Sequence, residues 1–189
     1  MKILVLEALA DERLLQQSLG QQGYEVATLQ LQVPNLSELI LNLQPDMVIL
    51  NVYSPDDMVL DVILSINQRH SVPVVLFAED QRTDTINKVI KAGVSAYIVD
   101  GLEPKRLKSI IEIAVARFQD QQALRNELEK TKTQLEDRKL IDRAKALLIK
   151  SQGYSEEQAY HTLRKLAMDR KLSLGDMAKN VMAMADLLK

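Results

Sequence analysis

Short apolar runs alternate with amphipathic segments along the first 100 residues of this 189-residue chain. The apolar runs are KILVLE (2–7), the weaker YEVAT (24–28), PDMVILNV (45–52), VPVVLFA (72–78) and AYIVD (96–100). The segments between them have helical spacing and span residues 11–23, 36–43, 58–68 and 81–93. Strands that alternate with helices predict a parallel sheet covered on both faces. The number of elements predicts a flavodoxin-like, doubly wound α/β domain over residues 1–120, with strand order 2-1-3-4-5.

The carboxyl edge of such a sheet is where a ligand or a reaction site is expected. The strand ends at this edge carry Glu7, Asn51, Ala78 and Asp100. Gly23 and Gly93 stand where helix C-caps are expected, since glycine tolerates the left-handed conformation.

A long helix is predicted to follow, because residues 105–152 contain neither glycine nor proline and are rich in helix formers. Pro104 stands at a favoured first helical position. At about 1.5 Å per residue the helix would extend for about 70 Å. We expect its first turns, with Leu107, Ile110, Ile111 and Ala114, to pack on the sheet.

The middle of this helix, residues 121–137, is predicted to be a coiled-coil linker. Leu124, Leu128, Thr131 and Leu135 follow one another at steps of 4, 3 and 4 residues. A monomeric, solvated spacer helix is the alternative. We favour a parallel homodimer, because a helix with so thin an apolar stripe gains little stability on its own.

Residues 138–189 are predicted to form an all-α, three-helix bundle with the end of the long helix as its first member. Gly153 would end that helix, Ser155 and Gln158 have capping-box spacing, and Ser173 is a candidate N-cap. The stripes expected to form the core are Ile141, Ala144, Leu147 and Leu148; Ala159, Leu163, Leu166 and Ala167; and Leu174, Met177, Ala178 and Val181.

Charge is distributed unevenly, with 10 Lys/Arg against 16 Asp/Glu in residues 1–120 and 14 against 10 in residues 121–189. The basic part favours an anionic partner. The cations expected to hold phosphates are Arg138, Lys139, Arg143, Lys145, Lys150, Arg164, Lys165, Arg170 and Lys171. Tyr154, in a turn, is expected to be exposed and able to stack on bases, whereas Tyr160 is expected to be half-buried beside His161.

Other classes of protein fit poorly. The chain has no cysteine and only two histidines, His70 and His161, so we expect neither a disulfide framework nor a histidine metal cluster, although carboxylates alone could bind magnesium. No cofactor is expected. No apolar run reaches membrane-spanning length, and the amino terminus turns acidic too early for a signal peptide. We therefore expect a cytoplasmic protein.

The first domain resembles the receiver domain of two-component response regulators, most clearly in IKAGVSAYIVDG (90–101). Receivers carry an acidic pair, a phosphorylated Asp, a Thr or Ser and a Lys at this edge. The corresponding positions here are Glu7 with Ala8, Asn51, Ala78 and Asp100. An amide is too weak a nucleophile for phosphoryl transfer, and an aspartate would repel the phosphate that a lysine attracts. The resemblance therefore implies a CheY-like pseudo-receiver without phosphorelay chemistry.

The last domain resembles the ANTAR domain, the RNA-binding output of certain response regulators. The matching residues are Ile141, Ala144, Lys145, Leu147, Leu148, Ser155, Glu157, Ala159, Tyr160, Leu163, Ala167, Met168 and Ala178. The order of domains is similar to that of antiterminators of the NasT/AmiR type. This resemblance implies a non-enzymatic regulator that binds leader mRNA hairpins and controls nitrate/nitrite assimilation genes. It also implies switching by a NasS-like, nitrate/nitrite-sensing partner protein.

Three alternatives stay open from the residues themselves. A three-helix bundle can also read duplex DNA. The chain can equally be an adaptor that contacts no nucleic acid. An enzyme of flavodoxin-like fold is the least favoured, because the sequence has no Gly-rich phosphate loop and no Ser-His-Asp set.

Overall fold

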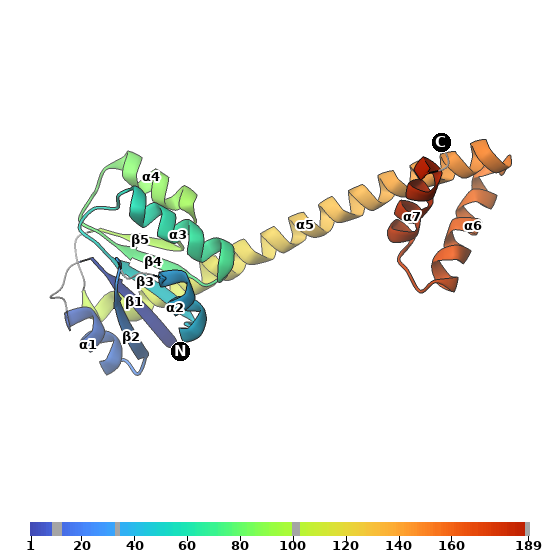
Figure 1. The fold of residues 1–189 in the computed structure, drawn as a ribbon. Helices are drawn as coiled ribbons and strands as arrows, with labels where there is room; N and C mark the ends of the chain where they lie inside the picture. Colours follow the sequence, from blue (N-terminus) through green and yellow to red (C-terminus); the bar gives the residue numbers. More distant parts are fainter. Residues whose placement is uncertain (9–12, 33–34, 100–102, 188–189) are drawn as a thin grey trace. The chain divides into compact units, whose positions relative to one another are not determined.

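The computed structural model divides into two compact units, Met1–Gln122 and Ala123–Lys189. The structure describes residues 1–8, 13–32, 35–99 and 103–187 (Figure 1).

The first unit is built on a five-stranded parallel sheet with strand order β2-β1-β3-β4-β5. The strands are β1 (Lys2–Glu7), β2 (Glu25–Gln30), β3 (Met47–Asn51), β4 (Val74–Phe77) and β5 (Ala96–Ile98). The order confirms the doubly wound fold that the alternating apolar runs predict.

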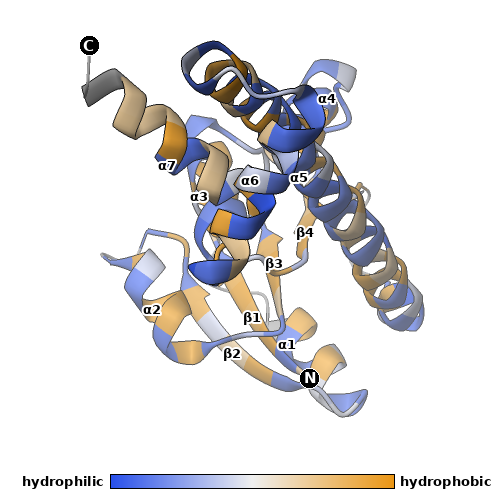
Figure 2. Cartoon of the chain, turned by 90° about the vertical axis from the view of Figure 1, so that its right-hand side faces the viewer, coloured by the Kyte–Doolittle hydropathy of each residue, from blue (hydrophilic) through white to orange (hydrophobic). Residues whose placement is uncertain are grey.

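Helices cover both faces of this sheet (Figure 1). They are α1 (Arg13–Gln21), α2 (Leu36–Leu43), α3 (Asp57–Arg69), α4 (Thr83–Ala92), a 3-10 turn (Pro104–Arg106) and α5 (Leu107–Gln152). Successive strand residues point to opposite faces. Leu4 and Leu6 of β1 therefore join the core beneath α2, α3 and α4, whereas Ile3 and Val5 join the core beneath α1 and α5. Figure 2 shows the strands as largely hydrophobic and much of α5 as hydrophilic.

Helix ends in this unit follow the sequence signals. Gly93 adopts a left-handed conformation, with φ of 100°, at the C-cap of α4. A side chain there would collide with Asn67, whose amide Nδ2 donates to the carbonyl oxygens of Ala92 at 2.8 Å and Gly93 at 3.1 Å. The first turns of α5 pack on the sheet as expected, with Leu107, Ile111 and Ala114 buried.

The second unit packs the last turns of α5 against α6 (Glu156–Asp169) and α7 (Leu174–Leu187). Its buried core consists of Ala144, Leu163, Ala167, Met177 and Ala178. Leu147, which was expected on the core stripe of α5, is only half-buried and lies outside this cluster, so the apolar stripe is narrower than predicted.

Both caps predicted in the second unit are present. In the capping box of α6, Gln158 N donates to Ser155 Oγ at 3.2 Å and Ser155 N donates to Gln158 Oε1 at 2.9 Å. At the start of α7, Asp176 N donates to Ser173 Oγ at 3.0 Å. Over the described residues, no helix combines the length and apolar character needed to cross a membrane.

Candidate functional site

The carboxyl edge of the sheet brings most of the expected pocket residues together. Parallel pairing of β1 with β3 sets Glu7 beside Asn51, and Ala8 N donates to the carbonyl oxygen of Asn51 at 3.1 Å. Ala78 follows β4 at the same edge, where its N–H donates to the carbonyl oxygen of Ile98 at 3.0 Å. Asp100 lies outside the described residues.

The side chains at this edge offer little for phosphoryl chemistry. Glu7 is 6% exposed and supplies a single carboxylate, whereas Ala8 and Ala78 have methyl side chains without polar atoms. Magnesium prefers several hard oxygen ligands held together. Over the described part of the chain, no cluster of three or more His, Asp or Glu side chains is placed to hold a metal ion.

A polar network that the sequence analysis missed lies just beyond β4. Ser54 Oγ donates to Asp80 Oδ2 at 2.9 Å, and Arg82 Nη2 donates to the same oxygen at 2.7 Å. Tyr97 Oη donates to the carbonyl oxygen of Asp80 at 2.6 Å. Hydrogen bonds from Arg82 hold the pKa of Asp80 well below its usual range. The network ties the connections after β3 and β4 to strand β5.

In the second unit, eight of the nine expected phosphate-binding cations are exposed. They are Arg138, Lys139, Arg143, Lys150, Arg164, Lys165, Arg170 and Lys171, and within the described ranges none has an acidic partner within 4.0 Å. Lys139, Arg143 and Lys150 share one face of α5, because their spacings of 4 and 7 residues correspond to about one and two helical turns. This cationic face has its charge available to solvent or to a ligand.

Lys145 has a different environment from these cations. Its Nζ lies 3.0 Å from Asp142 Oδ1 and 3.0 Å from Glu156 Oε1, and its side chain is 18% exposed. Hydrogen bonds to Asp142 and Glu156 raise the pKa of Lys145. Lys145 therefore connects α5 to the first turn of α6, and its charge is already neutralised within the unit.

The tyrosines of this unit match the expected exposures only in part, because Tyr154 is less exposed than expected. Tyr154 is partly buried, whereas Tyr160 is 39% exposed and makes an edge contact with His161 at 6.5 Å between ring centroids. Tyr160, Arg164 and Met168 follow one another at four-residue intervals along one face of α6, and Met168 is 69% exposed. An aromatic ring and a thioether thus share a helix face with the guanidinium group of Arg164, which has no acidic partner within 4.0 Å in the described ranges.

The leucine stripe in the middle of α5 is exposed in the single chain. Leu124 is 67% exposed, and Leu128 and Leu135 are each 54% exposed. Thr131 Oγ1 donates to the carbonyl oxygen of Glu127 at 2.9 Å, so its hydroxyl is satisfied within the helix. Large apolar side chains repeated at this spacing are typical of a helix that pairs with another helix.

Residues 129–182 match the family model of the ANTAR domain. The chain is 31% identical over 185 residues to the transcriptional regulatory protein PdtaR of Mycobacterium tuberculosis, covering 96% of this chain and 89% of that protein. It is 35% identical over 80 residues to the nitrate regulatory protein of Klebsiella oxytoca, covering 42% of this chain and 20% of that protein. These relatives are regulators by name.

A solved structure shares the fold of the first unit. The signal receiver domain of a modulated diguanylate cyclase from Desulfovibrio desulfuricans superimposes with a TM-score of 0.53 at 16% identity, covering 64% of this chain and 97% of that domain. At this level of identity the likeness shows the CheY-like receiver fold alone.

Proposed function

This chain belongs to the family of ANTAR-domain response regulators, and from that premise we propose that it is a transcription antitermination regulator which binds hairpins in leader mRNA. Binding to the leader would prevent a terminator from forming, so that polymerase continues into the operon. Because the transcript is made in the cytoplasm, the protein acts there.

The exposed cationic surface of the second unit is the observation that carries this proposal. Cationic side chains without acidic partners are available to hold phosphates, which supply most of the affinity for nucleic acid. The surface also exposes Tyr160, and aromatic rings stack on the unpaired bases of RNA loops. An RNA hairpin offers both features, a phosphate backbone and splayed bases, whereas duplex DNA keeps its bases stacked. This combination favours RNA over the alternative of a DNA-binding regulator.

The leucine stripe supports a homodimer that pairs through the coiled-coil linker of residues 121–137. In such a dimer two bundles, residues 138–189 of each chain, would bind two hairpins of one transcript. Binding of the second hairpin then becomes intramolecular and benefits from a high effective concentration.

We propose that a partner protein, and not phosphorylation, switches this protein between its inactive and active states. Asn51 lacks the carboxylate nucleophile of a receiver, and Ala8 and Ala78 lack the oxygen atoms that would hold magnesium and phosphate. We propose a ligand-sensing partner, a NasS-like nitrate/nitrite sensor, that holds the protein inactive until ligand arrives. The similarity to a protein named nitrate regulatory protein supports nitrate/nitrite assimilation genes as the target.

The RNA proposal is tested with transcripts recovered by crosslinking to the full-length protein in its native host. The recovered hairpins are resynthesised as RNA and as duplex DNA of the same sequence, and both are titrated in mobility-shift assays. Tight binding to the RNA and weak, strongly salt-dependent binding to the DNA are expected. Tighter binding to the duplex would support a DNA-binding regulator. If replacing Arg143 and Arg164 by alanine leaves antitermination intact, that result would support the alternative of an adaptor that contacts no nucleic acid.

The absence of phosphorelay chemistry is tested by incubating the protein with acetyl phosphate and magnesium. No stable phosphoprotein is expected in intact-mass spectra, with a conventional receiver domain as the positive control. A phosphoprotein that disappears on substitution of one residue at the carboxyl edge of the sheet would refute switching without phosphate.

A further inference from the structure

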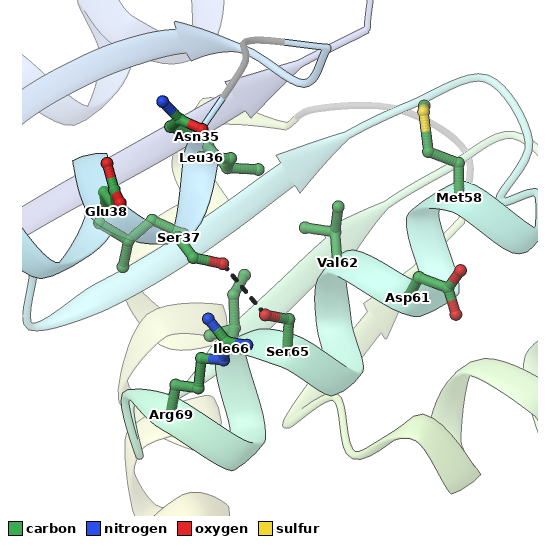
Figure 3. A pocket seen from close by; sticks show the side chains of 11 residues that line it. Asn35, Leu36, Ser37, Glu38, Met58, Asp61, Val62, Ser65, Ile66 and Arg69 are labelled. Atoms are coloured by element: carbon green, nitrogen blue, oxygen red, sulfur yellow. Dashed lines mark hydrogen bonds between the residues drawn. The ribbon is translucent and has the colours of Figure 1, made fainter.

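A cavity of about 460 Å³ opens between α2 and α3 of the first unit, and it shares no residue with the cationic surface (Figure 3). Ser37 of α2 and Ser65 of α3 line it and share a hydrogen bond, with 3.2 Å between their hydroxyl oxygens. The volume falls within the range of about 300–1,000 Å³ that is typical of small-molecule sites. This cavity therefore has the size of a ligand site in a unit whose receiver chemistry is degenerate.

The base of the cavity is apolar. Ile40 and Ile66, which are 2% and 1% exposed, belong to the core beneath it, and Leu36 and Val62 are partly buried against the same core. An apolar side chain of a ligand would be removed from water here, which stabilises binding by roughly 25 cal/mol for each Å² that becomes buried.

One end of the cavity carries opposite charges. Arg69, Glu38 and Ser37 line both this cavity and an adjoining hollow of about 150 Å³. Across the ranges that the structure describes, neither Arg69 nor Glu38 has an ion-pair partner within 4.0 Å. A guanidinium and a carboxylate that do not pair with each other can each bind a group of opposite charge on a ligand.

We propose that this cavity binds a small zwitterion, an α-amino acid with an apolar side chain. The ligand carboxylate pairs with Arg69, the ligand ammonium pairs with Glu38, and the hydroxyl groups of Ser37 and Ser65 offer further hydrogen bonds at the same end. The apolar side chain lies over Leu36 and Val62.

A third charge restricts the ligand further. Asp61 lines the cavity two turns before Arg69 on α3, about 12 Å away at the rise of an α-helix. A second carboxylate at the end of the ligand side chain would place a negative charge over the apolar wall and on the side of this acidic residue, and both are unfavourable. Monocarboxylic, apolar amino acids are therefore favoured over acidic ones.

The proposal is tested by titrating the isotope-labelled full-length protein with L-leucine and following backbone amide signals by NMR. Two analogues dissect the recognition: 4-methylpentanoate lacks the ammonium group, and 3-methylbutylamine lacks the carboxylate. Saturable shifts centred on Ser37, Glu38, Ser65 and Arg69 are expected with L-leucine. Each analogue, and L-glutamate, should bind at least about tenfold more weakly, because each loses or opposes one charge pair.

Substitutions assign the binding to the cavity. Arg69→Gln should abolish the shifts, whereas Arg117→Gln, at an exposed position on α5, should leave them unchanged. The rest of the amide spectrum reports whether each variant is folded. The proposal is overturned if L-leucine gives no saturable shift, if the shifts map elsewhere, if Arg69→Gln binds as well as the parent, or if either analogue binds as tightly as L-leucine.

Discussion

The cationic face of α5 makes a quantitative prediction about the salt dependence of RNA binding. Lys139, Arg143 and Lys150 share this face and have no acidic partner within 4.0 Å in the described part of the chain. Each phosphate contact releases about 0.7–0.9 of a counterion, depending on whether the nucleic acid is single- or double-stranded. Replacing all three residues by glutamine should therefore make the slope of log affinity against log salt shallower by about 2 to 3.

The assay is fluorescence anisotropy with a labelled hairpin over a series of salt concentrations. When the salt concentration rises fourfold, both proteins lose affinity for the hairpin. The factor by which affinity falls should be about 20 to 40 times smaller for the triple variant than for the parent protein, as follows from that change in slope. Glutamine preserves helix propensity, so the bundle should stay folded. A matched variant carries glutamine at Lys88, Lys91 and Lys105 of the first unit, three exposed cations, and should keep the parent slope.

Lys145 provides an internal control on the same helix. Its ammonium group is already held by Asp142 and Glu156, so Lys145→Met should leave the salt slope unchanged and lower the thermal stability of the second unit. The reasoning is refuted if the triple variant keeps the parent slope, or if the Lys145 variant changes the slope as much as one of the exposed cations does.

Three further predictions follow from the site. Tyr160→Ala should weaken hairpin binding by about 5- to 150-fold in the same anisotropy assay, because one stacked base contributes about 1–3 kcal/mol, whereas Tyr160→Phe should retain most of the affinity. The pKa of Asp80 is lowered in the folded chain from its ordinary 3.8, so its ionised form stabilises the fold above that pH, and this stabilisation is lost as the pH falls through the lower folded value. Asp80→Asn should thus lower the thermal midpoint at neutral pH and converge with the parent in acid, as followed by circular dichroism; a difference that stays constant with pH would contradict this. Lysine at both Leu124 and Leu128 should give a monomer in sedimentation equilibrium, unlike lysine at the exposed and polar Gln134. A dimer that survives would mean that the copies pair through another surface, and a parent chain that is already monomeric would favour the spacer helix.

The sheet and the helix caps could be predicted from sequence because the signals for them are local. A buried parallel strand is a short apolar run wherever it occurs, and the alternation of such runs with helices leaves few topologies. The capping box at Ser155 and the left-handed Gly93 likewise depend on residues within one turn of the helix end. These local signals do not depend on how the rest of the chain folds.

The polar interactions could not be predicted because they depend on distant partners. Ser54, Asp80 and Tyr97 come from three different connections or strands, and nothing in their spacing indicates that they meet. Lys145 resembles its cationic neighbours in sequence, and only the packing of α6 against α5 brings Glu156 to it. The partial burial of Tyr154 likewise could not be predicted from its place in a turn.

The continuity of α5 limits how nature or an engineer can exchange the two halves of this protein. Ile111 and Ala144 fill separate cores, yet both belong to one helix without a break. A recombination junction between the halves therefore has to fall inside a helix and not in a loop. Only insertions or deletions of about seven residues keep the leucines in phase with those of a paired copy, so the tolerated hybrids should differ in length by whole heptads.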